Sequence, residues 1–261
     1  MIHGCFRHFT GIGPRTAEVL NGSGFHTWED CISRQDDLPF NGRRRKRFMR
    51  ELRESAGALD SHDLGYFTSS FPAAEQWRIL AEYFDVAAFI DLESTGLSRY
   101  SCHASVIAAY CRGELYSFVY GENLDDFLVY ADDAELIVTF NGKAFDIPFI
   151  EKTFNIPSLD RPHLDLRWIA WHLGYRGGLK SIERQMGIRR PSNIDGIDGF
   201  EAVDLFHRWQ YGDISAKETL VAYCKADVIA TALVSDRLLA ETAGRKQRLD
   251  PETEFKKIGL R

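Results

Sequence analysis

The sequence contains, at residues 89–96, the run Phe-Ile-Asp-Leu-Glu-Ser-Thr-Gly. Its first part is apolar and β-like, and it then sets Asp91 and Glu93 two positions apart. Because side chains alternate along a strand, both carboxylates point to the same face. Two such acids repel each other, and a divalent cation is the simplest partner, since Mg²⁺ and Mn²⁺ prefer oxygen ligands. Taken alone, such a pair is more often an ordinary polar strand end.

A further acid follows a second apolar strand. Residues 139–148 read Thr-Phe-Asn-Gly-Lys-Ala-Phe-Asp-Ile-Pro, so that a strand over 135–140 ends at an Asn-Gly turn and a helix begins near Asp146. The simplest interpretation of Asp146 is a helix N-cap. A carboxylate at this helix start also faces the carboxyl edge of a sheet, so both roles are compatible.

The last acidic position lies in a long expected helix over 215–240. Residues 223–227 read Tyr-Cys-Lys-Ala-Asp. Tyr223 and Asp227 are four positions apart and therefore project from the same face of a helix. Aspartate is a poor helix former, which favours a specific role for Asp227. The alternative for this motif alone is a surface acid beside a half-buried tyrosine.

The periodicity around these motifs predicts the fold class. Three β-like runs come first, two of them separated by the tight turn Arg112-Gly113, and two more strands then alternate with helices. This order predicts an α/β domain of the ribonuclease-H-like type, with a mixed five-stranded sheet flanked by helices. The expected strands cover 86–93, 105–111, 114–120, 135–140 and 163–166, and the expected helices 72–84, 124–130, 147–154, 167–173, 179–186, 199–211 and 215–240.

The N-terminal residues look different. Residues 9–20 read Phe-Thr-Gly-Ile-Gly-Pro-Arg-Thr-Ala-Glu-Val-Leu and look like a helix-hairpin-helix, a small all-α module. Its turn, with Gly11, Gly13 and Arg15, would expose backbone N–H groups at a helix start, where a phosphate can bind. The basic run 43–47 is a second candidate nucleic-acid contact. The alternatives are a structural hairpin and a solvated helix face.

Composition sets the outer limits. The 261 residues divide into a module at 1–60, a polar linker at 61–72, a ribonuclease-H-like domain at 73–242 and a Lys/Glu-rich tail at 243–261 that is predicted to be mobile after Gly244. The net charge is −6, yet residues 1–60 carry +2 and the remainder −8. The charge therefore favours binding of a polyanion only in the N-terminal part.

The five cysteines include no C-x-x-C pair, and the start of the sequence lacks a signal-peptide pattern. We therefore expect a cytoplasmic protein without membrane association.

Together, the three acidic motifs, in this order, resemble the DEDDy 3′–5′ exonuclease superfamily over residues 77–240. The same motifs occur in the proofreading domains of family B DNA polymerases. The intervening pieces look like the YprB-type exonuclease group. They are Trp77-Arg78, His163-Leu-Asp-Leu166, Leu179-Lys-Ser-Ile-Glu183 and Glu201-Ala-Val203.

The resemblance implies roles for individual residues. Asp91, Glu93, Asp146 and Asp227 would hold two divalent metal ions, Mg²⁺ or Mn²⁺, with Asp91 bridging them. Tyr223 would orient the attacking water rather than act as a base, since a free phenol has a pKa near 10. The path of the 3′-terminal nucleotide would be lined by Thr95, Leu97, Asn141 and Phe145.

The expected activity is hydrolysis of phosphodiester bonds at the 3′ end of nucleic acid, with single-stranded or 3′-ended DNA favoured over RNA. Two alternatives stay open. One is a nucleic-acid-binding protein whose nuclease core is silent, although none of the five expected positions is substituted. The other is a structure-specific endonuclease or RNA-processing nuclease on the same core.

Overall fold

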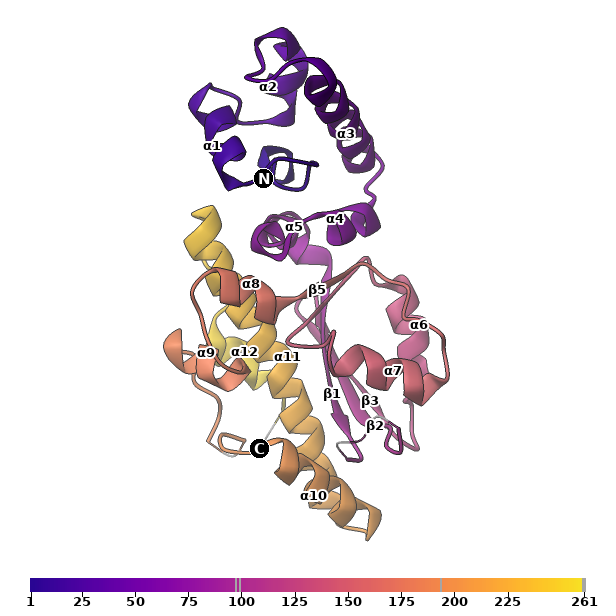
Figure 1. Ribbon diagram of the computed structural model, residues 1–261. Coiled ribbons are helices and arrows are strands. Elements are labelled where there is room, and N and C mark those ends of the chain that lie inside the picture. Colours follow the sequence, from indigo (N-terminus) through magenta and orange to yellow (C-terminus); the bar gives the residue numbers. More distant parts are fainter. Residues whose placement is uncertain (97, 99, 193, 260–261) are drawn as a thin grey trace. The chain divides into compact units, whose positions relative to one another are not determined.

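A computed structural model describes residues 1–96, 98, 100–192 and 194–259 (Figure 1). The chain forms two compact units, Met1–Tyr83 and Phe84–Arg261. None of the helices among the described residues combines the length and apolar character that a membrane crossing requires.

The first unit is all-helical. Its core is built largely from aromatic side chains, with the ring of Phe9 set edge-on against Phe48 and that of Trp28 stacked on Phe67. The long third helix contributes Phe48 and Leu52 to this core. In chain order the elements are η1 (Ile2–Gly4), α1 (Pro14–Gly22), α2 (Trp28–Ser33), η2 (Gln35–Asp37), α3 (Gly42–Asp60), α4 (Leu64–Ser70), η3 (Ala73–Glu75) and α5 (Trp77–Tyr83).

The second unit contains a mixed five-stranded sheet, as predicted, in the order β3-β2-β1-β4-β5. The first three strands pair antiparallel as a meander, and β4 and β5 run parallel to β1. The elements are η4 (Phe84–Val86), β1 (Ala87–Ser94), β2 (Ala104–Cys111), β3 (Glu114–Val119), α6 (Asp126–Asp133), β4 (Leu136–Thr139), α7 (Asp146–Phe154), β5 (His163–Asp165), α8 (Leu166–His172), α9 (Leu179–Gln185), α10 (Gly199–Gln210), α11 (Ile214–Ala243) and α12 (Pro251–Lys256).

Strand alternation in β1 separates two layers. Ala88, Ile90 and Leu92 join a core cluster with Phe127 of α6 and Phe149 of α7. The intervening positions face the other layer, where the long helix α11 packs against β1 and β2 (Figure 1). β1 is buried along nearly its whole length, which is typical of the central strand of a sheet covered on both faces. The two acids of β1 therefore lie on the α11 side.

Three segments differ from the simple sequence pattern. The expected linker at 61–72 contains α4, because Asp63 caps the helix and Leu64 and Phe67 are buried. The single helix expected from Pro72 to Phe84 is divided into η3, α5 and η4. The tail contains α12, which is held by the buried side chain of Phe255.

Candidate active site

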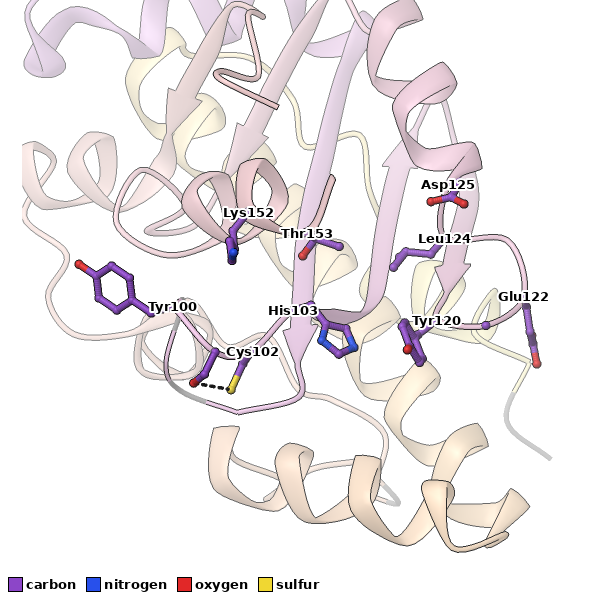
Figure 2. A pocket seen from close by; sticks show the side chains of 11 residues that line it. Tyr100, Cys102, His103, Tyr120, Glu122, Leu124, Asp125, Lys152 and Thr153 are labelled. Carbon is purple, nitrogen blue, oxygen red and sulfur yellow. Dashed lines mark hydrogen bonds between the residues drawn. The ribbon is translucent and has the colours of Figure 1, made fainter. Parts of the chain in front are cut away.

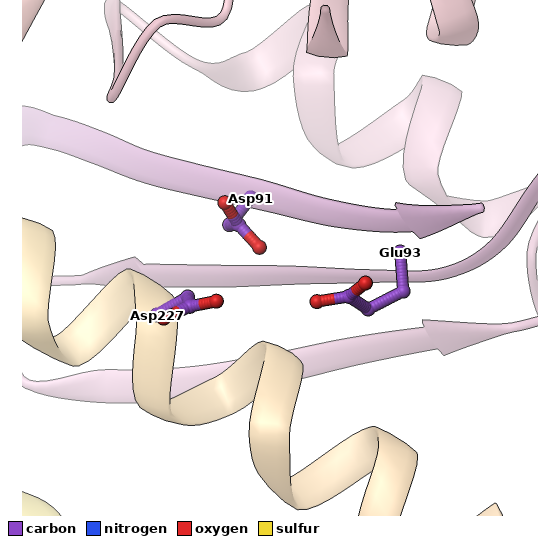
Figure 3. Close-up of side chains that lie close together, drawn as sticks. All are labelled: Asp91, Glu93 and Asp227. Carbon is purple, nitrogen blue, oxygen red and sulfur yellow. The ribbon is translucent and has the colours of Figure 1, made fainter. Parts of the chain in front are cut away.

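Three carboxylates converge between β1 and α11. Asp91 and Glu93 project from β1 and Asp227 from α11, and one oxygen of each lies within 4.8 Å of the others (Figure 3). The pairing of the two strand acids follows from their i, i+2 spacing. Oxygen atoms at this separation can bind one hard divalent cation together. The charge of such a cation would screen the repulsion between the carboxylates.

The electrostatics of the group confirm that the acids are crowded. Burial, followed by the charge of Asp227 and then that of Asp146, holds the pKa of the Asp91 carboxyl well above its usual range. The pKa of Glu93 is raised by the same causes in the same order. A cation bound among these carboxylates would lower each pKa again, so the site is chemically suited to a metal.

The fourth predicted acid, Asp146, lies beside this group but is not part of it. It is the first residue of α7 and is buried, and its Oδ1 accepts a hydrogen bond from the backbone N–H of Leu92 at 3.1 Å. Burial raises the pKa of Asp146 to about 7, against the lowering effect of its backbone hydrogen bonds. Asp146 thus joins the start of α7 to the strand that carries Asp91 and Glu93.

A cavity of about 450 Å³ opens beside the carboxylates, with Asp91, Asp227 and Tyr223 in its wall. Tyr223 lies one helical turn before Asp227, as the i, i+4 spacing predicts. Burial raises the pKa of the Tyr223 phenol far above its usual value, with a further contribution from Asp227. The hydroxyl is therefore neutral at physiological pH. The remaining lining residues are Phe140, Gly178, Leu179, Lys180, Ser181, Arg184, Asp198 and Gly199.

Two cations of the site were not predicted from the sequence. The guanidinium of Arg190 contacts Asp227 and forms a two-point pair with Glu183, at 2.8 Å from Nε and 2.6 Å from Nη2. The Lys180 ammonium lies 4.8 Å from the centre of the Tyr223 ring. Glu183 and Lys180 fall in the segment 179–183, for which the sequence predicts no roles of individual residues. Arg190 follows a Gly-Ile-Arg run that carries no recognisable motif.

Three of the residues predicted to line the nucleotide path, Thr95, Asn141 and Phe145, are not in the wall of this cavity. Thr95 exchanges hydrogen bonds with His103. The backbone of Asn141 is held by Asp165, and the ring of Phe145 packs on Phe149 at 4.6 Å. Leu97, the fourth of these residues, lies outside the described residues.

A second cavity, of about 530 Å³, lies near the start of β2 (Figure 2). Tyr100, His103, Tyr120 and Lys152 contribute to its wall, and the carboxylate group does not. It mixes aromatic, acidic and basic side chains, and its residues were not singled out from the sequence.

The N-terminal unit places the predicted glycine turn at the start of α1. Gly11 has a positive φ of 78°, Gly13 is the N-cap residue, and the exposed Arg15 lies in the first turn. Two arginines of α3 hold this turn, because Arg44 donates to the carbonyl of Gly11 and Arg47 to that of Thr10, each at 3.2 Å. Part of the basic run is therefore used inside the unit.

Comparison with known proteins gives one family match and weaker similarities to solved structures. The family described as RNase_H superfamily matches residues 88–239. A search of curated proteins finds no match. Among solved structures, the family B DNA polymerase of Pyrobaculum calidifontis has a TM-score of 0.47 and 18% identity, over 59% of this chain and 24% of the polymerase. The Aedes aegypti Nibbler EXO domain has a TM-score of 0.40 and 13% identity, over 70% of this chain and 91% of that domain.

Proposed function

The chain belongs to the RNase H superfamily, and from this membership we propose that it is a metal-dependent 3′–5′ exonuclease of the DEDDy, YprB-like type. The observation that carries the proposal is the convergence of Asp91, Glu93 and Asp227 within 4.8 Å between the central strand β1 and helix α11. Three acids this close together repel one another when they are ionised, and a bound divalent cation would relieve that repulsion.

Each residue of the site has a role in this proposal. Asp91, Glu93 and Asp227 would hold Mg²⁺ or Mn²⁺, and Asp146 would complete the set of ligands for a second ion through water. When bound, such ions supply an activated water and neutralise charge on the leaving 3′ oxygen. The neutral hydroxyl of Tyr223 would fix the direction of the water, and Lys180, in the same cavity wall, would attract the phosphate backbone.

We further propose that the N-terminal unit is a helix-hairpin-helix that binds nucleic acid through contacts of its own, with DNA as the preferred substrate. The exposed side chains of Arg15, Arg43 and Lys46 support this, because they make no hydrogen bond or ion pair with another described residue. Cations without a protein partner are free to contact phosphates.

The decisive experiment uses one oligonucleotide labelled at either end, incubated with Mg²⁺ or Mn²⁺. An exonuclease acting from the 3′ end releases a 3′ label at once as a mononucleotide and shortens the 5′-labelled strand stepwise. The Asp91→Asn variant should be inactive. A circular single strand should stay intact, and its cleavage would instead establish an endonuclease. Comparing the rates of hydrolysis of DNA and RNA oligonucleotides of the same sequence identifies the preferred nucleic acid.

One observation favours a second candidate, a nucleic-acid-binding protein with a silent core. Arg190 already contacts Asp227, so a cation of the protein occupies one side of a proposed metal ligand. If wild-type protein binds oligonucleotides but cleaves none with either metal, while Arg190→Met gains Mn²⁺ affinity, the silent core is the correct interpretation.

A further inference from the structure

Helix α8 presents two tryptophans to solvent. Trp168 and Trp171 are each 46% exposed, whereas Leu166, Ile169 and Ala170 on the opposite side of the helix are buried. Residues three positions apart share a face of a helix, so the two indoles are neighbours. Paired exposed aromatic rings are uncommon on a protein surface and generally mark a contact site.

An arginine accompanies each ring. The guanidinium of Arg167 lies 5.8 Å from the Trp168 ring centre, and that of Arg176 lies 4.6 Å from the Trp171 ring centre. Within the part of the chain that the structure describes, neither arginine forms an ion pair with an acid. Arg167 donates instead to the Asn141 side chain at 2.7 Å, and Arg176 donates to backbone carbonyls. The surface therefore keeps both positive charges.

This surface, which we call the tryptophan face (Arg167, Trp168, Trp171 and Arg176), adjoins the cavity beside the carboxylates. At one end, Arg167 is bonded to Asn141, the neighbour of the cavity residue Phe140. At the other end, the carbonyl of Arg176 accepts hydrogen bonds from Ser181 Oγ at 3.4 Å and from Gln185 Nε2 at 2.8 Å, and Ser181 lines the same cavity.

We propose that the tryptophan face binds a single nucleic-acid strand, with consecutive bases stacked on Trp168 and Trp171 and the phosphates near Arg167 and Arg176. Stackable rings interleaved with unpaired cations match the alternating bases and phosphates of an unpaired strand. A duplex offers its bases only at an end, so the face selects single-stranded segments. The inference rests on the proposed nuclease function, because the strand bound on the tryptophan face would be the substrate whose 3′ end reaches the carboxylates.

The test measures binding without hydrolysis. Fluorescence anisotropy of a labelled single strand of about 12 nucleotides is recorded in EDTA for the full chain. Trp168→Ala/Trp171→Ala should weaken binding by about thirtyfold per ring, the middle of the range for one stacked base. Trp168→Phe/Trp171→Phe keeps a ring at each position and should stay within about threefold of wild type. Tyr211→Ala, at a 92% exposed aromatic residue after α10, is the matched control and should change nothing.

An abasic strand of the same length separates stacking from charge. It should bind wild type more weakly than the normal strand and should be insensitive to the alanine substitutions. Equal losses on both strands, or no loss on either, would overturn the stacking assignment. A change from dimer to monomer in the alanine variant, with strand binding unaffected, would identify the face as a contact between protein chains and would also overturn it.

Failure of this inference can be told apart from failure of the nuclease proposal. If hydrolysis of labelled strands by wild type proceeds while the alanine variant binds normally, only the tryptophan face is wrong. If tryptophan-dependent binding is seen and no hydrolysis occurs with either metal, the face stands and the nuclease proposal fails.

Discussion

The buried guanidinium of Arg190 contacts the carboxylate of Asp227, the acid that meets Asp91 and Glu93 between β1 and α11. Burial alone would lower the pKa of Arg190, but the charges of Asp227 and Glu183 raise it above its usual value. A fixed cation therefore screens one acid of a crowded group. Its position is set by Glu183 on α9, whose side chain is 3% exposed.

Arg190→Met should destabilise the protein by about 3–5 kcal/mol, because Glu183 then stays buried without a partner. The double variant Glu183→Leu/Arg190→Met should recover much of this loss, since both buried charges are gone. Urea unfolding in EDTA measures the two free energies. The matched control is Arg208→Gln in the exposed Arg208–Asp213 pair, where a much smaller loss is expected because solvent screens the two charges. Equal losses at both pairs would contradict the buried role.

The sequence predicts much of this site because its signals are local. The spacing of Asp91 and Glu93 on a strand, and of Tyr223 and Asp227 on a helix, determines which side chains share a face. Arg190 gives no such signal, since its partners Glu183 and Asp227 lie on two other elements and only the tertiary structure brings them together. The hydrogen bond from Leu92 to Asp146 is equally invisible to periodicity, because it joins a strand to the start of a helix far along the chain.

The boundaries of most strands and helices are also predictable because they depend on local sequence signals. The segments that differ from the prediction, such as α4 and α12, depend on tertiary contacts. The Lys/Glu-rich sequence after Gly244 predicts a mobile tail. Glu254 of α12 nevertheless accepts a hydrogen bond from the hydroxyl of Tyr110, at 2.7 Å, across a large separation in sequence. No pattern within the tail itself indicates that partner.

The metal-free protein should become less stable as the pH rises from about 4 to about 7. Burial raises the pKa of Asp146 to about 7 in the folded chain, whereas an unfolded aspartate titrates near pH 3.9. The folded state binds more protons between these values, so each pH unit costs up to about 1.4 kcal/mol per group. Thermal melting in EDTA at pH 5 and pH 7 measures the effect. Asp146→Asn should flatten the profile, and a rise in Tm with pH would contradict the prediction.

Metal binding should depend on the three convergent acids. Because Asp91→Asn removes a charged ligand and leaves the shape unchanged, it should abolish Mn²⁺ binding or weaken it at least about tenfold. Isothermal titration measures the affinity, and proton release should accompany binding, since the carboxyls with raised pKa must ionise. The control is Asp125→Asn, an exposed acid of the second cavity. Unchanged Mn²⁺ affinity in Asp91→Asn would place the ion elsewhere.

The unpaired cations of the N-terminal unit should supply salt-dependent affinity for long substrates. Arg15→Gln/Arg43→Gln/Lys46→Gln should reduce the slope of log K against log salt by roughly 2–3, or about 0.7–0.9 for each lost phosphate contact. Hydrolysis of a dinucleotide should stay near wild type.

A charge-matched control removes three cations that are already paired with acids, Arg112, Arg161 and Arg208. It should leave the salt slope nearly unchanged. Equal slopes for the two triple variants would show that the N-terminal unit is a structural hairpin.

Tyr223 offers the sharpest test of the proposed chemistry. Its hydroxyl is neutral because burial raises its pKa, and it lines the same cavity as Asp227. Tyr223→Phe removes no charge, so Mn²⁺ affinity and KM should change little. It removes the group that would orient the water, which should lower kcat by about 10²–10³-fold, or roughly 3–4 kcal/mol. Asp227→Ala should be worse, because a ligand is lost as well. Tyr110→Phe, which loses the bond to Glu254, is the control and should affect stability rather than kcat. Near-wild-type turnover of Tyr223→Phe, measured under conditions in which chemistry limits the rate, would make the tyrosine a packing residue and leave the carboxylates as the sole basis of the assignment.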